Sequence, residues 1–81
     1  MRIRVLLFAA AREAAGCGSF EIELPQGSTV REAQREIGER IPPLAARLPH
    51  CRIALDREFA EIDAALRDGA ELAIIPPVSG G

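Results

Sequence analysis

The chain begins with an alternation of apolar and polar side chains. From Arg2 to Ala9 the large aliphatic residues at 3, 5 and 7 alternate with arginines and other apolar residues. This pattern predicts a β-strand with one face fully buried and the other face partly covered. The side chains of the buried face are Ile3, Val5 and Leu7. The alanine-rich stretch 10–15 stops at Gly16, and we expect a short helical turn there.

A second strand and a helix follow in the next part of the chain. Residues 19–24 alternate strictly between apolar side chains and glutamates, which predicts a strand. Thr29, with Glu32 three residues later, is a capping-box signature for a helix that runs to about Arg40. Its apolar positions share one face and therefore predict packing on that side. They are Val30, Ala33, Ile37 and Ile41.

Prolines and turn residues divide the remainder of the chain. Pro42 and Pro43 prevent the helix from continuing, and Leu44 to Leu48 form at most one further turn before Pro49. Two apolar stretches, 52–55 and 59–62, surround a polar turn and predict a hairpin, and 71–75 predicts a last strand. The element order predicts an α+β domain in which a mixed sheet packs on one main helix.

The size and charge of the chain limit the number of domains it can form and the partners it can bind. With 81 residues and 8.7 kDa, the chain can enclose one hydrophobic core, and its mean hydropathy of +0.08 is that of a folded protein. Ten basic and twelve acidic residues give a net charge of −2. This balance provides no electrostatic footprint for nucleic acid or an anionic membrane, so we expect neither as a partner.

The longest apolar run, 5–11, is too short to cross a bilayer. Two arginines before it and three alanines at its end give it a weak likeness to a secretory signal. Cleavage there would remove the first predicted strand, and two cysteines are few for a small secreted scaffold. We therefore expect a cytoplasmic protein.

All ten basic residues are arginines, which excludes a Schiff-base or P-loop lysine. It also leaves the α-amino group as the one amine able to intercept an activated C-terminus of the same chain. A bias in base composition is the simpler explanation. Cys17, Cys51 and His50 fall short of a four-ligand zinc site, so we expect no metal.

No group of residues forms a convincing catalytic constellation. Glu21 and Glu23 share the outward face of a strand and are interpreted as solvated charges. His50 and Cys51 are adjacent, but a nucleophile and its base must meet in space with a third, orienting group. A redox or persulfide role for Cys17 or Cys51 stays open.

The end of the chain is its most informative segment. Pro76 and Pro77 follow directly on the last strand and would project the chain stiffly away from the sheet. The final Gly80 and Gly81 have no Cβ, so their backbone can pass through a channel too narrow for other residues. A frayed terminus of small residues is the alternative. The combination favours a tail that presents its carboxylate inside another protein.

Four segments resemble those of a known family. They are 5–13 (VLLFAAARE), 29–30 (TV), 63–69, which ends LRDG, and 76–81 (PPVSGG). In their order, and in the length of the chain, they resemble the small, sulfur-carrying subunits of molybdopterin synthase, in the ubiquitin-like MoaD/ThiS family. The resemblance implies a β-grasp fold, with a domain over 1–75 and an extended Gly-Gly tail over 76–81.

The resemblance also implies a carrier mechanism. An adenylyltransferase similar to ubiquitin-activating enzymes would use ATP to adenylate Gly81, and a sulfur donor would then displace AMP to leave a thiocarboxylate. The large synthase subunit would supply the catalytic side chains and transfer the sulfur to a cyclic pterin precursor. This chain would be a non-catalytic subunit and co-substrate within a heterotetrameric synthase, with no permanently bound cofactor.

The family's docking residues carry over to particular positions of this sequence. Phe8 and Ile75 correspond to the apolar docking patch. Gly80 corresponds to the glycine that precedes the reacting Gly81. The segment that guides tail entry corresponds to Pro76, Pro77, Val78 and Ser79. Phe8 has the core as its alternative location, and Arg12 and Glu13 match the family either as a local ion pair or as partner contacts. Asp56, Ala70 and the pair 74–75 depart from the usual Asn, Asp and aromatic residues.

Two other functions fit a domain that ends in Gly-Gly. A carrier of another sulfur pathway, of the thiamine type, would use the same chemistry. A ubiquitin-like modifier would instead form isopeptide bonds to lysines of target proteins. A plain interaction module with an incidental Gly-Gly is the third alternative.

Overall fold

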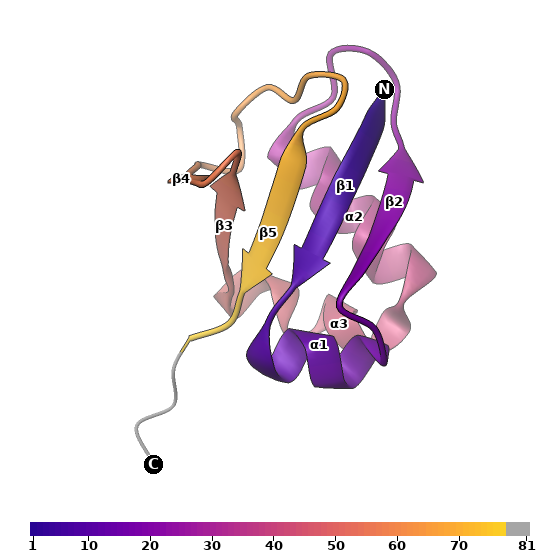
Figure 1. The fold of residues 1–81 in the computed structure, drawn as a ribbon, viewed down its shortest axis with the longest axis vertical. Helices are drawn as coiled ribbons and strands as arrows, with labels where there is room; N and C mark the ends of the chain where they lie inside the picture. The colour runs from indigo at the N-terminus through magenta and orange to yellow at the C-terminus, as the bar shows by residue number, and fades with distance from the viewer. Residues whose placement is uncertain (78–81) are drawn as a thin grey trace.

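The structure is a computed structural model that describes residues 1–77. Five strands and three short or medium helices, with one 3-10 turn, make up this part of the chain (Figure 1). In chain order they are β1 (Arg2–Leu7), α1 (Ala9–Ala15), β2 (Ser19–Glu23), α2 (Val30–Arg40), α3 (Pro42–Ala45), η1 (Leu48–His50), β3 (Arg52–Leu55), β4 (Glu58–Phe59) and β5 (Glu71–Ile75).

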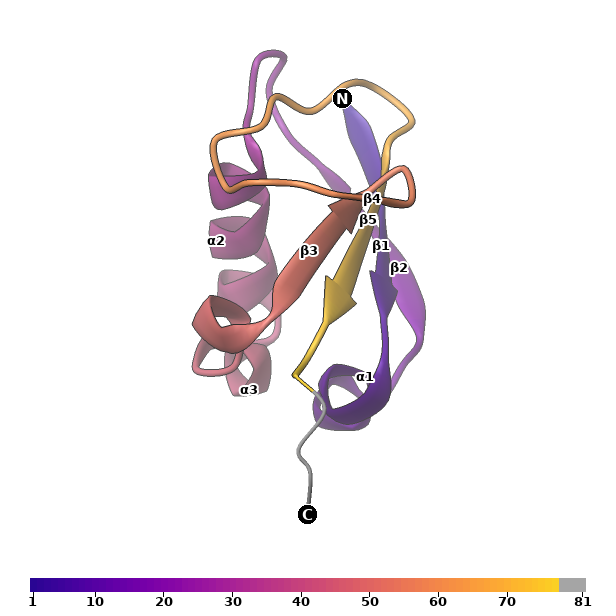
Figure 2. The ribbon, with the colours of Figure 1, turned by 90° about the vertical axis from the view of Figure 1, so that its left-hand side faces the viewer.

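The strands form one mixed sheet in the order β2-β1-β5-β3-β4. The central strands β1 and β5 are parallel, and the other pairs are antiparallel. Figure 2 shows α2 across one face of the sheet, with α1 and α3 at the end where β1 and β5 finish. This is the α+β architecture that the sequence predicts, and the β-grasp expectation is taken up with the structural comparisons below.

The core lies between the sheet and α2, and the predicted alternation decides its contents. Ile3, Val5 and Leu7 are all buried, as expected. The apolar stripe of α2 supplies Val30, Ala33 and Ile37, which are fully buried, whereas Ile41 packs at the margin. The helix begins where the sequence predicts, since the Glu32 carboxylate accepts a hydrogen bond from the Thr29 N–H at 3.3 Å.

The predicted length of the second strand of the hairpin is wrong. The sequence predicts a strand over 59–62, but β4 covers only Glu58–Phe59. The chain leaves the sheet there because its carbonyls bind the start of α2: Ile62 O accepts from Arg31 N–H at 2.8 Å, and Ala64 O from Val30 N–H at 3.0 Å. These acceptors satisfy amides that have no partner within the helix.

Two smaller boundaries also differ. After α2 the prolines give two short turns, α3 and η1, rather than the one expected. The first strand ends at Leu7, two residues earlier than predicted, because Phe8 is the N-cap of α1. None of the helices in residues 1–77 has the length and apolarity needed to cross a membrane.

Candidate functional site: the outer face of the sheet

The outer face of the sheet, opposite α2, carries a continuous row of apolar side chains. Leu6 of β1 lies beside Ala73 of β5, Ala73 beside Ala54 of β3, and Ala54 beside Phe59 of β4. Side chains alternate between the faces of a strand, so these register partners share the face that does not contact the core. The row therefore crosses four strands.

Two further residues complete this surface next to the end of β5. Phe8 lies just beyond β1 and is 46% exposed, and Ile75 is the last residue of β5. Because alanines occupy the centre, the larger residues around them leave a shallow, mainly apolar hollow of about 400 Å³. We call this surface the apolar patch; its members are Leu6, Phe8, Ala54, Phe59, Ala73 and Ile75.

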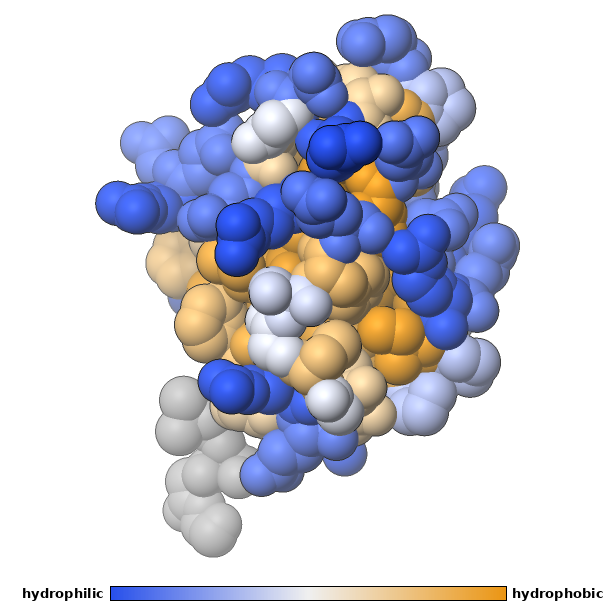
Figure 3. Space-filling view, turned by 45° about the vertical axis from the view of Figure 1, so that its right-hand side comes forward, coloured by the Kyte–Doolittle hydropathy of each residue, from blue (hydrophilic) through white to orange (hydrophobic). Residues whose placement is uncertain are grey.

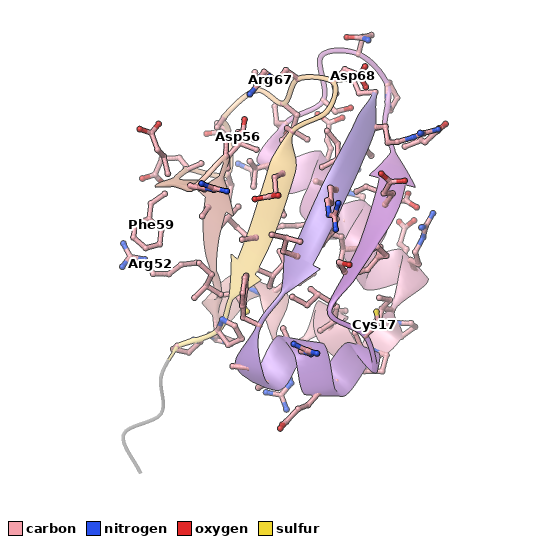
Figure 4. The ribbon with its side chains drawn as sticks, viewed as in Figure 1. Cys17, Arg52, Asp56, Phe59, Arg67 and Asp68 are labelled. Carbon is pink, nitrogen blue, oxygen red and sulfur yellow. The ribbon has the colours of Figure 1, made fainter. Side chains whose placement is uncertain are left out.

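Phe59 is the most exposed large apolar side chain of the described residues, at 63%. The Arg52 guanidinium lies over its ring, 4.1 Å from the centroid, and Figure 4 shows the two side chains together at the β3–β4 edge. The arginine holds the ring by a cation–π contact while leaving its other side open. Phe59 therefore forms a raised rim of the apolar patch.

The other half of the outer face is charged. Arg4 lies between Glu21 of β2 and Glu71 of β5, and Arg2 pairs with Glu23 at 3.7 Å. In the space-filling view apolar residues gather in the middle of the molecule, below a band of charged ones (Figure 3). The face is thus divided, with its apolar half next to the point where the tail leaves β5.

The hairpin that carries Phe59 is held by Asp56. Asp56 and Arg57 form its tip, with φ of 50° and 72°, a left-handed backbone that aspartate tolerates better than most residues. The Asp56 carboxylate accepts hydrogen bonds from Glu71 N–H at 3.0 Å and from the Arg67 guanidinium at 2.8 Å. The backbone hydrogen bond from Glu71, together with Arg67, lowers the pKa of Asp56. The hairpin is therefore fixed against the start of β5 (Figure 4).

The predicted docking residues lie in two environments. The structure places Phe8 on the surface rather than in the core, beside Ile75 in the apolar patch, and their contact with a partner stays a prediction. Pro76 is buried and Pro77 exposed, so the chain is anchored as far as Pro76. The remaining predicted site residues lie outside the described part of the chain; they are Val78, Ser79, Gly80 and Gly81.

The other chemistry-bearing residues are dispersed. The Cys51 thiol is half-buried and donates to Arg47 O at 3.2 Å, and burial raises its pKa. Cys17 is exposed between α1 and β2, and His50 is exposed at the end of η1, directly before Cys51. No group of three or more His, Cys, Asp or Glu residues within 1–77 is arranged to hold a metal ion.

Sequence reasoning placed Phe59 in the hairpin but did not identify it as a site residue. The sequence contained part of the signal, a phenylalanine directly after the polar turn of a predicted hairpin. In the structure Phe59 pairs with Ala54, and because Ile53 faces the core, both Ala54 and Phe59 face outward. What the sequence alone could not supply was the register that makes Ala54 its partner.

Comparison with known proteins identifies the family. The model of the ThiS family matches residues 5–81. The molybdopterin synthase sulfur carrier subunit of Chlamydomonas reinhardtii is 40% identical over 83 residues, covering 100% of both chains. The crystal structure of SAMP1, small archaeal modifier protein 1, from Haloferax volcanii is 29% identical with a TM-score of 0.93, covering 100% of both chains.

A further solved structure contains a similar chain in an assembly. It is the complex of subunits 1 and 2 of molybdopterin-converting factor from Helicobacter pylori, matched at 27% identity and a TM-score of 0.73 over 100% of both chains. At lower identity, 12%, a ubiquitin-like protein from Trypanosoma brucei shares the fold with a TM-score of 0.69. These likenesses confirm the expected β-grasp fold. The chain belongs to the ThiS family, among the molybdopterin synthase sulfur carrier subunits.

Proposed function

We propose that this chain carries sulfur as a thiocarboxylate on Gly81 and delivers it within molybdopterin synthase. The apolar patch carries this proposal, because it lies beside the end of β5, from which the tail emerges. A partner that covers Phe8 and Ile75 is positioned to receive the six residues that follow. The chemistry then belongs to the partners, and this chain supplies a docking surface and a reactive terminus.

Activation requires conversion of an unreactive carboxylate into an electrophile. A carboxylate oxygen of Gly81 attacks the α-phosphorus of ATP, and pyrophosphate leaves to give an acyl adenylate. A sulfur donor at the oxidation level of hydrosulfide then attacks the carbonyl carbon. The C–S bond forms, the C–O bond to AMP breaks, and AMP leaves with the electron pair. We propose an adenylyltransferase similar to ubiquitin-activating enzymes as the partner for this step, with ATP as its substrate.

Transfer requires the large synthase subunit as the second partner. The Helicobacter pylori complex, in which a similar chain is one of two subunits, supports this pairing. Each thiocarboxylate would deliver one sulfur to the cyclic pterin precursor and return to a carboxylate, so two carriers are consumed per dithiolene. The free thiols Cys17 and Cys51 support a reducing compartment, and we place the protein in the cytoplasm.

The decisive test is a mass measurement on the intact chain. The protein is incubated with the activating enzyme, ATP and a sulfide source, and the oxygen-to-sulfur change is followed at the C-terminus. Deletion of Gly81 is the matched control, and we expect it to abolish the change while circular dichroism stays the same. Absence of the mass change in the full chain, with an activating enzyme proven on a known carrier, would refute the proposal.

The likeness to SAMP1 favours one alternative, a protein modifier. In that function the same adenylate would be captured by a lysine of a target protein, leaving a Gly-Gly remnant after proteolysis. A proteomic search for that remnant in cells distinguishes the two functions. Complementation of a strain that lacks only the small synthase subunit distinguishes the proposed carrier from one of the thiamine type. Growth restored by this chain would support the role in molybdopterin synthase.

A further inference from the structure

We infer that this chain is an acyl donor whose own amine cannot be the acceptor: an activated Gly81 is open to sulfur or to another protein's amine, but not to an amine of the same chain. The inference rests on the proposed activation of Gly81. It concerns which nucleophile captures the activated carbonyl, and it applies both to the sulfur carrier and to the modifier alternative.

The first part of the argument is the inventory of amines. All ten basic residues are arginines, so the α-amino group of Met1 is the one primary amine in the sequence. A guanidinium stays protonated at any physiological pH and has no free lone pair to attack an acyl group. Stable amide formation within the chain is therefore limited to the amine of Met1.

The second part is the distance between the two ends of the chain. Strand β1 runs parallel to β5, with Leu7 beside Ile74, so Met1 lies at the end of the sheet opposite to the tail (Figure 1). Six residue steps separate Met1 from Leu7, and two more lead from Ile74 to Pro76. At about 3.3 Å per residue the separation is about 26 Å.

The tail is too short to return over this distance. Pro76 is buried, so the chain can pivot only beyond it, and five residues, 77–81, remain. Fully extended they reach at most about 18 Å. An attack by Met1 on Gly81 of the same molecule is thus excluded by about 8 Å, even for a tail directed straight back along the sheet.

The third part is the state of the Met1 amine itself. Its nitrogen is partly buried and donates a hydrogen bond to Leu24 O at 2.6 Å. An attack on a second molecule would require the N-terminus to leave this position and expose the nitrogen. Acylation would otherwise form the C–N bond, break the C–O bond to AMP, and release AMP and a proton. The fold hinders this side reaction between copies as well.

The experiment uses a C-terminal thioester of residues 1–81 as a chemical stand-in for the adenylate. Two single lysine variants provide the comparison. Arg52→Lys introduces an amine directly beside Ile75, its register partner, within reach of the tail. Arg2→Lys introduces one on the same face at the opposite end of the sheet. Both arginines are exposed, and circular dichroism checks that each variant is folded.

Intact mass is followed at mildly alkaline pH over a range of protein concentrations. An excess of the same free thiol returns any exchange with Cys17 or Cys51 to the starting thioester, so only amide formation accumulates. We expect the wild-type thioester only to hydrolyse, and R52K to lose its thiol in a concentration-independent cyclisation. R2K should give at most slow, concentration-dependent dimers. Wild-type cyclisation or dimerisation at the rate of R52K would overturn the inference. So would an unreactive R52K, because lack of an acceptor would then not be what protects the wild type. No activating enzyme is involved, so failure of the proposed carrier function leaves this result interpretable.

Discussion

Replacement of Phe59 by alanine tests whether the apolar patch is the docking surface. A phenylalanine side chain presents about 200 Å², of which 63% is exposed here, so a partner could bury about 125 Å². At about 25 cal/mol per Å² full burial contributes about 3 kcal/mol to binding. If the partner covers half of this area, the contribution is about 1.5 kcal/mol, which corresponds to about a tenfold change in Kd.

The fold should tolerate this change. Phe59 loses only its cation–π contact with Arg52, about 0.5 to 1 kcal/mol, so the melting temperature should fall by a few degrees. Calorimetric titration with the large synthase subunit of the same organism gives Kd, which we expect to rise between about tenfold and 150-fold.

Ile62→Ala is the matched control for Phe59→Ala. Ile62 is 40% exposed and does not line the hollow of the apolar patch, although it shares a neighbouring hollow with Phe59. If the partner covers the apolar patch, truncation of Ile62 should change Kd by less than about twofold. An unchanged Kd in F59A, or an equal loss in both variants, would refute the assignment of the patch.

Three further predictions address the hollow, the hairpin and the helix start. Ala73→Glu places a charge at the centre of the hollow, where an apolar partner surface would desolvate it, and should weaken the same complex by at least about 100-fold, with cooperative thermal unfolding retained; no loss of affinity would contradict the assignment. Asp56→Asn should lower the free energy of unfolding by about 0.5 to 1 kcal/mol at neutral pH, because the exposed pair with Arg67 is lost. The pKa of Asp56 is lowered in the folded state, so its contribution is present above the ordinary value of 3.8 and disappears as pH falls through the folded pKa; urea unfolding at pH 7 and below pH 3.8 should show the gap closing. Glu32→Ala removes the acceptor of the Thr29 N–H and should cost about 1 kcal/mol in the same assay, whereas Glu39→Ala near the end of the helix should cost less.

The core-facing residues could be predicted from the sequence, because burying one face of a strand or helix requires apolar residues at a regular spacing. The alternation of Ile3, Val5 and Leu7, and the stripe through Ile37, each have one arrangement that hides the apolar side chains. The capping box at Thr29 is equally local, since its two members are three residues apart. In each case the deciding interaction lies within a few residues of the chain.

The predictions were wrong where hydrogen bonds to backbone groups far away in the sequence determine where an element ends. Nothing near Ile62 in the sequence shows that its carbonyl receives the Arg31 N–H, and this hydrogen bond ends β4. The apolar patch likewise depends on the register of β1, β5, β3 and β4, which brings Leu6 and Phe59 to the two sides of paired alanines. The resemblance to a known family was enough to single out Phe8 and Ile75. The remaining residues of the apolar patch could be found only once the strand order and register of the sheet were known.

Under the proposed docking, the division of the outer face would allow so small a domain to specify how a partner binds. The residues that face α2 are committed to the core, so information for recognition must be carried by the alternate positions of the same strands. Those near β5's end are apolar, whereas Arg4, Glu21 and Glu71 at its start carry charges. A partner that is apolar where it meets Ile75 would place charged Arg4 and Glu71 against its own apolar surface if it bound with the opposite orientation, leaving charges desolvated without partners. If the apolar patch is the docking surface, the boundary between the two halves would set the direction in which the partner meets the tail, which a uniformly apolar sheet could not do.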